Sequence, residues 1–128
     1  MGKKRVKLAG NFVEQGWNDI GAPSLVEQRG RRSPANKDKV VAYLKAGVAY
    51  IVSPGFDVDF FAPPKLAAVS TIRTDGEYAW PSALAYYVEN YDVELAPDFE
   101  AHMQRNHWKV PENIDPRSLE LPPAPPEA

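Results

Sequence analysis

Residues 74–91 read TDGEYAWPSALAYYVENY, and this stretch decides the fold. An Asp-Gly pair between β-prone segments is a good hairpin signal, so residues 66–73 and 77–80 are expected to pair as antiparallel strands. Pro81 is suited to the first position of a helix. Behind it, four side chains recur at helical spacing: Leu84, Tyr87, Val88 and Tyr91. The sequence therefore predicts a hairpin that runs directly into a helix over residues 81–91.

Upstream of the hairpin, the sequence predicts one helix and one short strand. Asn36 can cap a helix over residues 37–46 through its side-chain oxygen, and Gly47 stands where a left-handed C-cap residue is wanted. Residues 48–52 are β-prone and stop at a Ser-Pro-Gly turn over residues 53–55.

A second upstream strand is expected over residues 56–60, where apolar and acidic residues alternate. Alternation places Phe56, Val58 and Phe60 on one face. Asp57 and Asp59 then lie on the other face, which is expected to be the solvated one. The two carboxylates could instead bind a divalent cation, since hard cations prefer oxygen ligands.

Downstream, Pro97 opens another predicted helix over residues 97–107, and six prolines from Pro111 onward predict an extended tail over residues 111–128. The expected fold is one α+β domain over about residues 5–110. It has a small, mainly antiparallel sheet of three or four strands, with helices near 37–46, 81–91 and 97–107 packed on one face. The predicted organisation is an irregular basic N-terminal arm over residues 1–35, an α+β core over residues 36–110, and the tail.

The 128-residue composition excludes several classes of site. The chain has no cysteine, which rules out a disulfide framework, a cysteine zinc site and a thiol nucleophile. His102 and His107 are five residues apart, whereas a helical zinc pair needs a spacing of four. Neither a nucleophile elbow nor a glycine-rich phosphate loop occurs. We therefore expect no catalytic residues, no metal and no cofactor, although an enzyme whose site is dispersed along the sequence remains an alternative.

The two parts of the chain carry opposite charge. Residues 1–45 hold ten Lys and Arg and four Asp and Glu, a net charge of +6, and residues 46–128 hold five and thirteen, a net charge of −8. The basic clusters at residues 3–7 and 29–32 leave a small nucleic-acid-binding protein as an alternative function. No stretch approaches the roughly 20 apolar residues of a membrane helix. A cytoplasmic protein is therefore expected.

Carboxylates surround the aromatic residues of the hairpin and of the helix that follows it. Such a surface suits a basic protein partner, because aromatics supply contact area and acids speed the encounter. The alternative is that the aromatics belong to the core and the acids only solvate it. The candidate partner-binding residues are Asp75, Glu77, Tyr86, Glu89, Asp92 and Glu94.

The stretch from Lys39 to Met103 resembles a small, largely uncharacterised bacterial family that is often associated with polymorphic-toxin and contact-dependent inhibition loci. The resemblance implies an immunity-type protein, which binds a cognate toxin domain and blocks it without catalysis. It carries over no active-site residues. It rests on residues 41–47, 53–55, 74–81 and 84–88, and on Tyr91, Val93, Leu95, Pro97, Phe99, His102 and Met103.

Overall fold

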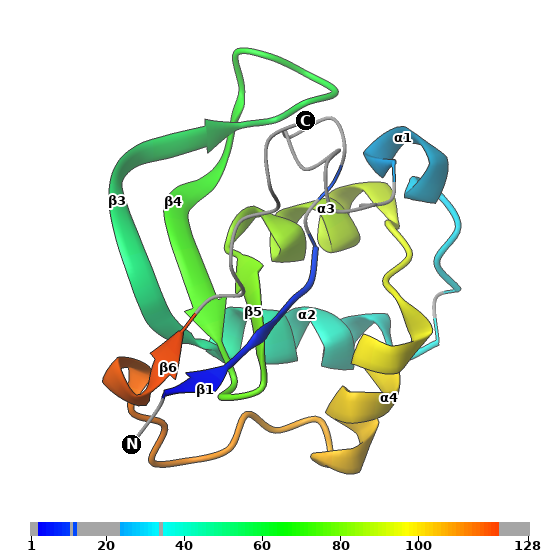
Figure 1. Ribbon diagram of the computed structural model, residues 1–128. Coiled ribbons are helices and arrows are strands. Elements are labelled where there is room, and N and C mark those ends of the chain that lie inside the picture. The colour runs from blue at the N-terminus through cyan, green and yellow to red at the C-terminus, as the bar shows by residue number, and fades with distance from the viewer. Residues whose placement is uncertain (1–2, 11, 13–23, 34, 121–128) are drawn as a thin grey trace, which may run out of the picture.

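The computed structural model describes residues 3–10, 12, 24–33 and 35–120 (Figure 1). These residues form an α+β fold, as the sequence predicts. The elements in chain order are β1 (Lys4–Arg5), β2 (Lys7–Leu8), α1 (Leu25–Gln28), α2 (Lys37–Ala46), β3 (Val48–Val58), β4 (Leu66–Thr74), β5 (Tyr78–Pro81), α3 (Ala83–Tyr91), α4 (Pro97–Arg105), a 3-10 turn (Pro116–Ser118) and β6 (Leu119–Glu120).

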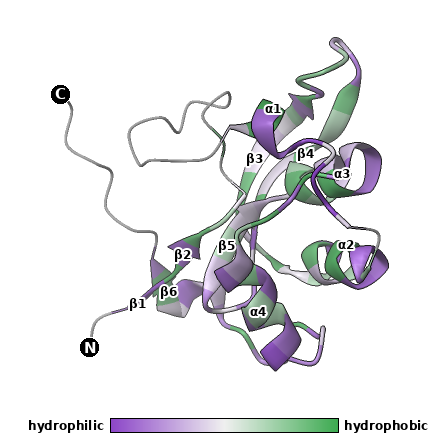
Figure 2. Ribbon diagram, turned by 90° about the vertical axis from the view of Figure 1, so that its right-hand side faces the viewer, coloured by the Kyte–Doolittle hydropathy of each residue, from purple (hydrophilic) through white to green (hydrophobic). Residues whose placement is uncertain are grey.

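The main sheet has four strands in the order β2-β5-β4-β3. The long β3–β4 pair and the β4–β5 pair are antiparallel, as expected, whereas β2 runs parallel to β5. β1 and β6 form a separate parallel pair. Figure 2 shows α2, α3 and α4 on one side of the sheet, so the helices cover one face and β3 is left at an edge.

The core lies between the helices and the β4–β5 hairpin, with Trp80 among its largest fully buried side chains. The indole Nε1 of Trp80 donates a hydrogen bond to the carbonyl of Leu44, 3.0 Å away, which ties β5 to the last turn of α2. A Cβ atom on Gly47 would lie 2.5 Å from Cζ2 of Trp80. Gly47 has a φ of −57°, so the predicted left-handed C-cap is wrong. Glycine is required at this position because the indole of Trp80 occupies the space that a side chain would need.

Two other helix ends also differ from the predictions. Asn36 is left-handed, with a φ of 63°, and makes no side-chain cap; its backbone carbonyl accepts from Val40 instead. Pro81 is the last residue of β5, so α3 begins two residues later, at Ala83. The α4 helix does begin at Pro97, but it ends at Arg105, shortly before the left-handed His107.

β3 is a single irregular strand, whereas the sequence predicted two strands separated by a turn. Its register against β4 shifts between Val52 and Phe56, so the Ser-Pro-Gly segment is absorbed within the strand. The predicted faces are also wrong. Phe56, Val58 and Phe60 are exposed, and Asp59 is fully buried. Asp59 lies just beyond the strand, where tyrosines of α3 provide hydrogen bonds to its carboxylate.

A second, smaller cluster joins the two ends of the described chain. Val6, Ala79 and Leu119 are buried together, with Ile114 packed against them. The N–H of Val6 donates to the carbonyl of Glu120, which extends the β1–β6 pairing. Residues 116–120, which the sequence assigned to an extended tail, thus form a 3-10 turn and a strand. The rest of the predicted tail, residues 121–128, lies outside the described residues.

Candidate functional site

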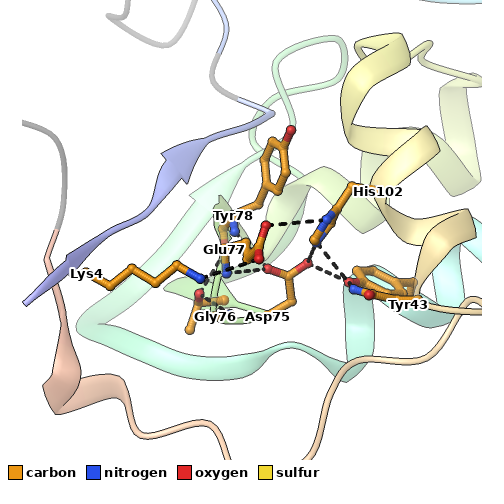
Figure 3. Close-up of polar contacts among 9 residues, drawn as sticks. Lys4, Tyr43, Asp75, Gly76, Glu77, Tyr78 and His102 are labelled. Atoms are coloured by element: carbon orange, nitrogen blue, oxygen red, sulfur yellow. Dashed lines mark hydrogen bonds and ion pairs between the residues drawn. The ribbon is translucent and has the colours of Figure 1, made fainter.

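Asp75, the first predicted partner-binding residue, is buried under the tip of the β4–β5 hairpin. Its Oδ1 accepts the backbone N–H groups of Glu77 and Tyr78 at 2.9 and 2.7 Å. Its Oδ2 lies 2.5 Å from the Tyr43 hydroxyl, which donates to it, and 2.7 Å from Nε2 of His102. Figure 3 shows Tyr43 and His102 pointing at this carboxylate from the helix side. Asp75 therefore holds α2 and α4 against the hairpin and is not available to a partner.

Tyr43 and His102, the side-chain partners of Asp75, are themselves buried. Burial, together with the hydrogen bond to Asp75, raises the pKa of Tyr43 far above its ordinary range. The amide of Asn106 donates to the Tyr43 hydroxyl at 3.0 Å. Glu77 is exposed at the outer side of the turn, 3.4 Å from Nζ of Lys4 and 3.8 Å from Nδ1 of His102. Both oxygens of the buried carboxylate are thus occupied by the protein's own donors.

Tyr86 belongs to a second cluster, centred on Asp59. The hydroxyls of Tyr86 and Tyr91 both donate to Oδ2 of Asp59 at 2.6 Å. Burial alone raises the pKa of Asp59, but these bonds and those from the backbone outweigh it and leave the pKa below its ordinary value. The guanidinium of Arg29 lies 4.8 Å from the centre of the Tyr91 ring. Asp57, within β3, has Ser70 of β4 as its hydrogen-bond partner. The described residues contain no group of three or more side chains suited to a metal ion.

The other predicted acids lie on or next to α3, and two of them pair with lysines of α2. Oε2 of Glu89 is 2.9 Å from Nζ of Lys45, and Oδ1 of Asp92 is 2.7 Å from Nζ of Lys37. Glu94 is exposed, and no ion pair links it to another described residue. The structure therefore places Glu89 and Asp92 in a surface of mixed charge, each beside a lysine of α2.

Intrachain ion pairs account for much of the uneven charge of the sequence. Five of the eight pairs among the described residues join the first 45 residues to the rest of the chain. The pair of Arg32 is bidentate, since both terminal nitrogens donate to Glu100, at 3.0 and 2.7 Å. Arg29 stacks on aromatic rings, and Lys4 and Arg5 pair with acids. The basic clusters thus support the fold with several of their side chains.

A groove of about 280 Å³ opens between α2, α3 and β4. It brings together two of the predicted residues, Tyr86 and Glu89, with Arg73, which sequence reasoning missed. Arg73 donates from Nε to Ser82 Oγ at 3.0 Å and from Nη1 to the carbonyl of Gly47 at 2.9 Å. The lining residues are Leu44, Lys45, Ala67, Ala68, Val69, Arg73, Ser82, Ala85, Tyr86, Glu89 and Asn90.

Next to the groove, the β3–β4 hairpin exposes two cross-strand pairs of large apolar side chains. Phe56 pairs with Val69, and Val58 pairs with Leu66; their exposed fractions are 59, 44, 47 and 53%. Cross-strand partners share a face of the sheet, as do residues two apart along a strand. We call these four residues the hairpin patch. Because Val69 also lines the groove, the patch and the groove are continuous.

Comparison with protein-family models, with curated protein sequences and with solved structures finds no match to this chain. The resemblance to an immunity-type family therefore stays a prediction. Within the described part of the chain, no helix is both long enough and apolar enough to cross a membrane. The candidate site consists of the groove and the hairpin patch.

Proposed function

We propose that this protein is a non-catalytic protein-binding module that holds another protein on the hairpin patch. The observation that carries the proposal is the exposure of two adjacent pairs of large apolar side chains on one face of an edge hairpin. Contiguous apolar surface of this kind is unfavourable in water and marks interaction sites. The edge strand β3 also offers backbone groups to a partner strand.

The partner that we propose is a bacterial toxin domain, which the protein would neutralise in the cytoplasm as a stoichiometric inhibitor. This part rests on the resemblance of residues 39–103 to immunity-type proteins. The geometry supports a binding role over a chemical one, because the hydrogen-bonding capacity of the buried Asp75 cluster is directed at Tyr43, His102 and the hairpin backbone. Nucleic-acid binding has less support, since Arg32, Lys4 and Arg5 pair with acids of the same chain.

The test is affinity capture with the tagged full-length chain, followed by mass spectrometry of the proteins bound at stoichiometric amounts. The double variant Phe56→Ser and Leu66→Ser removes apolar area from the patch at exposed positions, so folding is expected to be preserved. Glu112→Lys, also at an exposed position, is the matched control. The proposal expects one protein bound by the wild type and by the control but not by the patch variant.

Two results would overturn the proposal. One is the absence of any stoichiometric protein, and the other is equal capture by the patch variant, verified as folded by circular dichroism. The proposal that the partner is a toxin domain has a separate test. The captured protein, or its binding fragment, is expected to arrest growth when expressed alone and to be harmless when co-expressed with this chain.

A further inference from the structure

Arg73 is the one described arginine that lines the groove, and its charge has no counterpart nearby. No carboxylate of the described residues lies within 4.0 Å of its guanidinium. Two hydrogen bonds, to Ser82 Oγ and the Gly47 carbonyl, account for two of its five N–H groups. The Nη2 atom of Arg73 makes no hydrogen bond within the described part of the protein. Since every buried side-chain nitrogen and oxygen of the described residues has a hydrogen-bond partner, Nη2 is not buried and is open to solvent. The guanidinium of Arg73 is thus fixed in position and retains N–H groups that donate to no acceptor of the described residues.

The surroundings of Arg73 combine this charge with apolar walls. Small and apolar side chains line the groove around it, including Ala67, Ala85 and Val69. The only acid in the lining, Glu89, is paired with Lys45 at the rim. The groove therefore carries a net positive charge. A carboxylate entering it would meet a guanidinium fork that is already oriented, and the partly desolvated walls would strengthen the interaction.

We infer that the groove takes an acidic side chain of the bound protein, with the flanking apolar residues of that protein lying on the hairpin patch. This inference rests on the proposed function and names the chemistry of the partner's contact segment: a carboxylate between apolar side chains. Two features carry it, the unpaired donors of Arg73 and the continuity of groove and patch through Val69. The partner's contact segment is thus acidic, whereas the carboxylates around the aromatic residues of the sequence suggest a basic partner. Glu89 and Asp92 do not attract a basic partner strongly, because each already pairs with a lysine of α2.

The experiment uses two synthetic tripeptides, N-acetyl-Phe-Glu-Leu-amide and N-acetyl-Phe-Gln-Leu-amide, which differ only in the carboxylate. Each is titrated into the ¹⁵N-labelled full chain and followed by NMR at the Arg73 Nε–H and the Ser82 amide. The acidic peptide is expected to bind about tenfold more tightly, in line with a charge-assisted hydrogen bond. It should also shift the Arg73 Nε–H, which the neutral peptide leaves in place.

Four variants and one control locate the effect. Arg73→Gln is expected to remove the preference for the acidic peptide, and Arg73→Lys to keep part of it. Since Arg73 also supports Gly47 and Ser82, Val69→Asp provides an independent variant, which places a repelling carboxylate at an exposed position of the groove. Val52→Asp is the matched control, because Val52 is 72% exposed and does not line the groove. Glu89→Gln is expected to increase the preference.

Equal affinity of the two peptides for the wild type would overturn the inference. So would a preference that survives both Arg73→Gln and Val69→Asp. The outcome is separable from that of the proposed function. A protein captured by the wild type and by Arg73→Gln, but not by the patch variant, would support the proposed function and overturn the groove contact.

Discussion

Tyr86 on α3 donates a 2.6 Å hydrogen bond to the carboxylate of Asp59, which lies in the loop after β3. Tyr91, five residues along the chain, donates to the same oxygen at the same distance. The N–H of Phe61 completes the set at the other oxygen, 2.8 Å away. Asp59 thus fixes the loop end of the β3–β4 hairpin to α3, and the hairpin patch next to this loop depends on it for its position.

Replacement of Asp59 by Asn is expected to destabilise the protein by about 2 kcal/mol, the range for a charged hydrogen-bond acceptor. Folding lowers the pKa of this carboxyl, so its stabilising effect is complete above its ordinary pKa and is lost as the pH falls through the lowered value. The wild type should therefore lose stability at acid pH more steeply than the Asn variant does. Urea unfolding at neutral pH and at about pH 3 checks both statements.

Asp57→Asn is the matched control for that experiment. Burial raises the pKa of Asp57, despite the opposing hydrogen bond to Ser70. A raised pKa means that folding disfavours the ionised carboxylate, which therefore lowers the stability of the native state at neutral pH. Asp57→Asn removes this charge, so the variant should be as stable as the wild type or slightly more stable at neutral pH. A loss equal to that of Asp59→Asn would contradict the distinction between the two acids.

Arg32→Met is expected to cost about 3–5 kcal/mol, because it leaves Glu100 without its bidentate partner. The Arg32 side chain is only 4% exposed, and its Nε also donates to the carbonyl of Val93 at 3.0 Å. Lys45→Met breaks the exposed pair with Glu89 and is expected to cost less than about 1 kcal/mol. Similar losses in the two variants, measured by denaturant unfolding, would contradict the role given to burial.

Trp80→Ala is expected to cost about 3–5 kcal/mol, as for a large, fully buried aromatic side chain. The substitution also leaves the Leu44 carbonyl without its donor. Trp108, which is half-buried, is the matched control, and its replacement by Ala should cost clearly less. Thermal unfolding followed by circular dichroism compares the two variants.

Gly47→Ala is expected to cost about 1–3 kcal/mol through overpacking against the Trp80 ring. If the clash is the cause, a smaller ring relieves it. The combination of Gly47→Ala with Trp80→Phe should then cost less than the sum of the two single variants. Additive losses would show that the glycine is required for another reason.

All six tyrosines have a pKa above the ordinary value, chiefly because of burial and of hydrogen bonds to Asp59. The unfolded chain therefore ionises at lower pH than the native state, and stability falls as the pH rises past about 10. A spectrophotometric titration is expected to show phenolate appearing together with loss of the native circular dichroism. Titration of several tyrosines near their ordinary pKa in the folded protein would contradict this.

Local signals in the sequence predict much of the fold. The Asp-Gly turn, the apolar stripe of α3 and the proline at the start of α4 all correspond to the structure. The alternation of apolar and acidic residues over 56–60 led to a wrong prediction of the buried face. Such alternation separates two faces of a strand but does not determine which of them is buried. The pairing of Lys4 with Leu119 leaves no trace in the sequence, since the two strands are two residues long and stand at opposite ends of the described chain.

The candidate site was predictable only in part. Tyr86 and Glu89 do line the groove, but an acid in a tight turn looks solvent-exposed, and nothing local shows that Tyr43 and His102 converge on Asp75. Arg73 offered a signal that was missed, a single positive charge inside an otherwise uncharged strand. Its lack of an acidic partner is a property of the tertiary structure.

The parallel pairing of β1 with β6 has a consequence for the order in which the fold can be completed. Val6 is buried against Leu119, and its N–H is bonded to Glu120. During synthesis this contact must wait until residue 120 has left the ribosome, since residues 119 and 120 are made more than 110 residues after Val6. Until then Val6 and Ala79 lack the apolar contact that Leu119 provides. The β1–β6 pairing joins the first and the last of the described strands, so it is present in the folded protein and absent from the nascent chain.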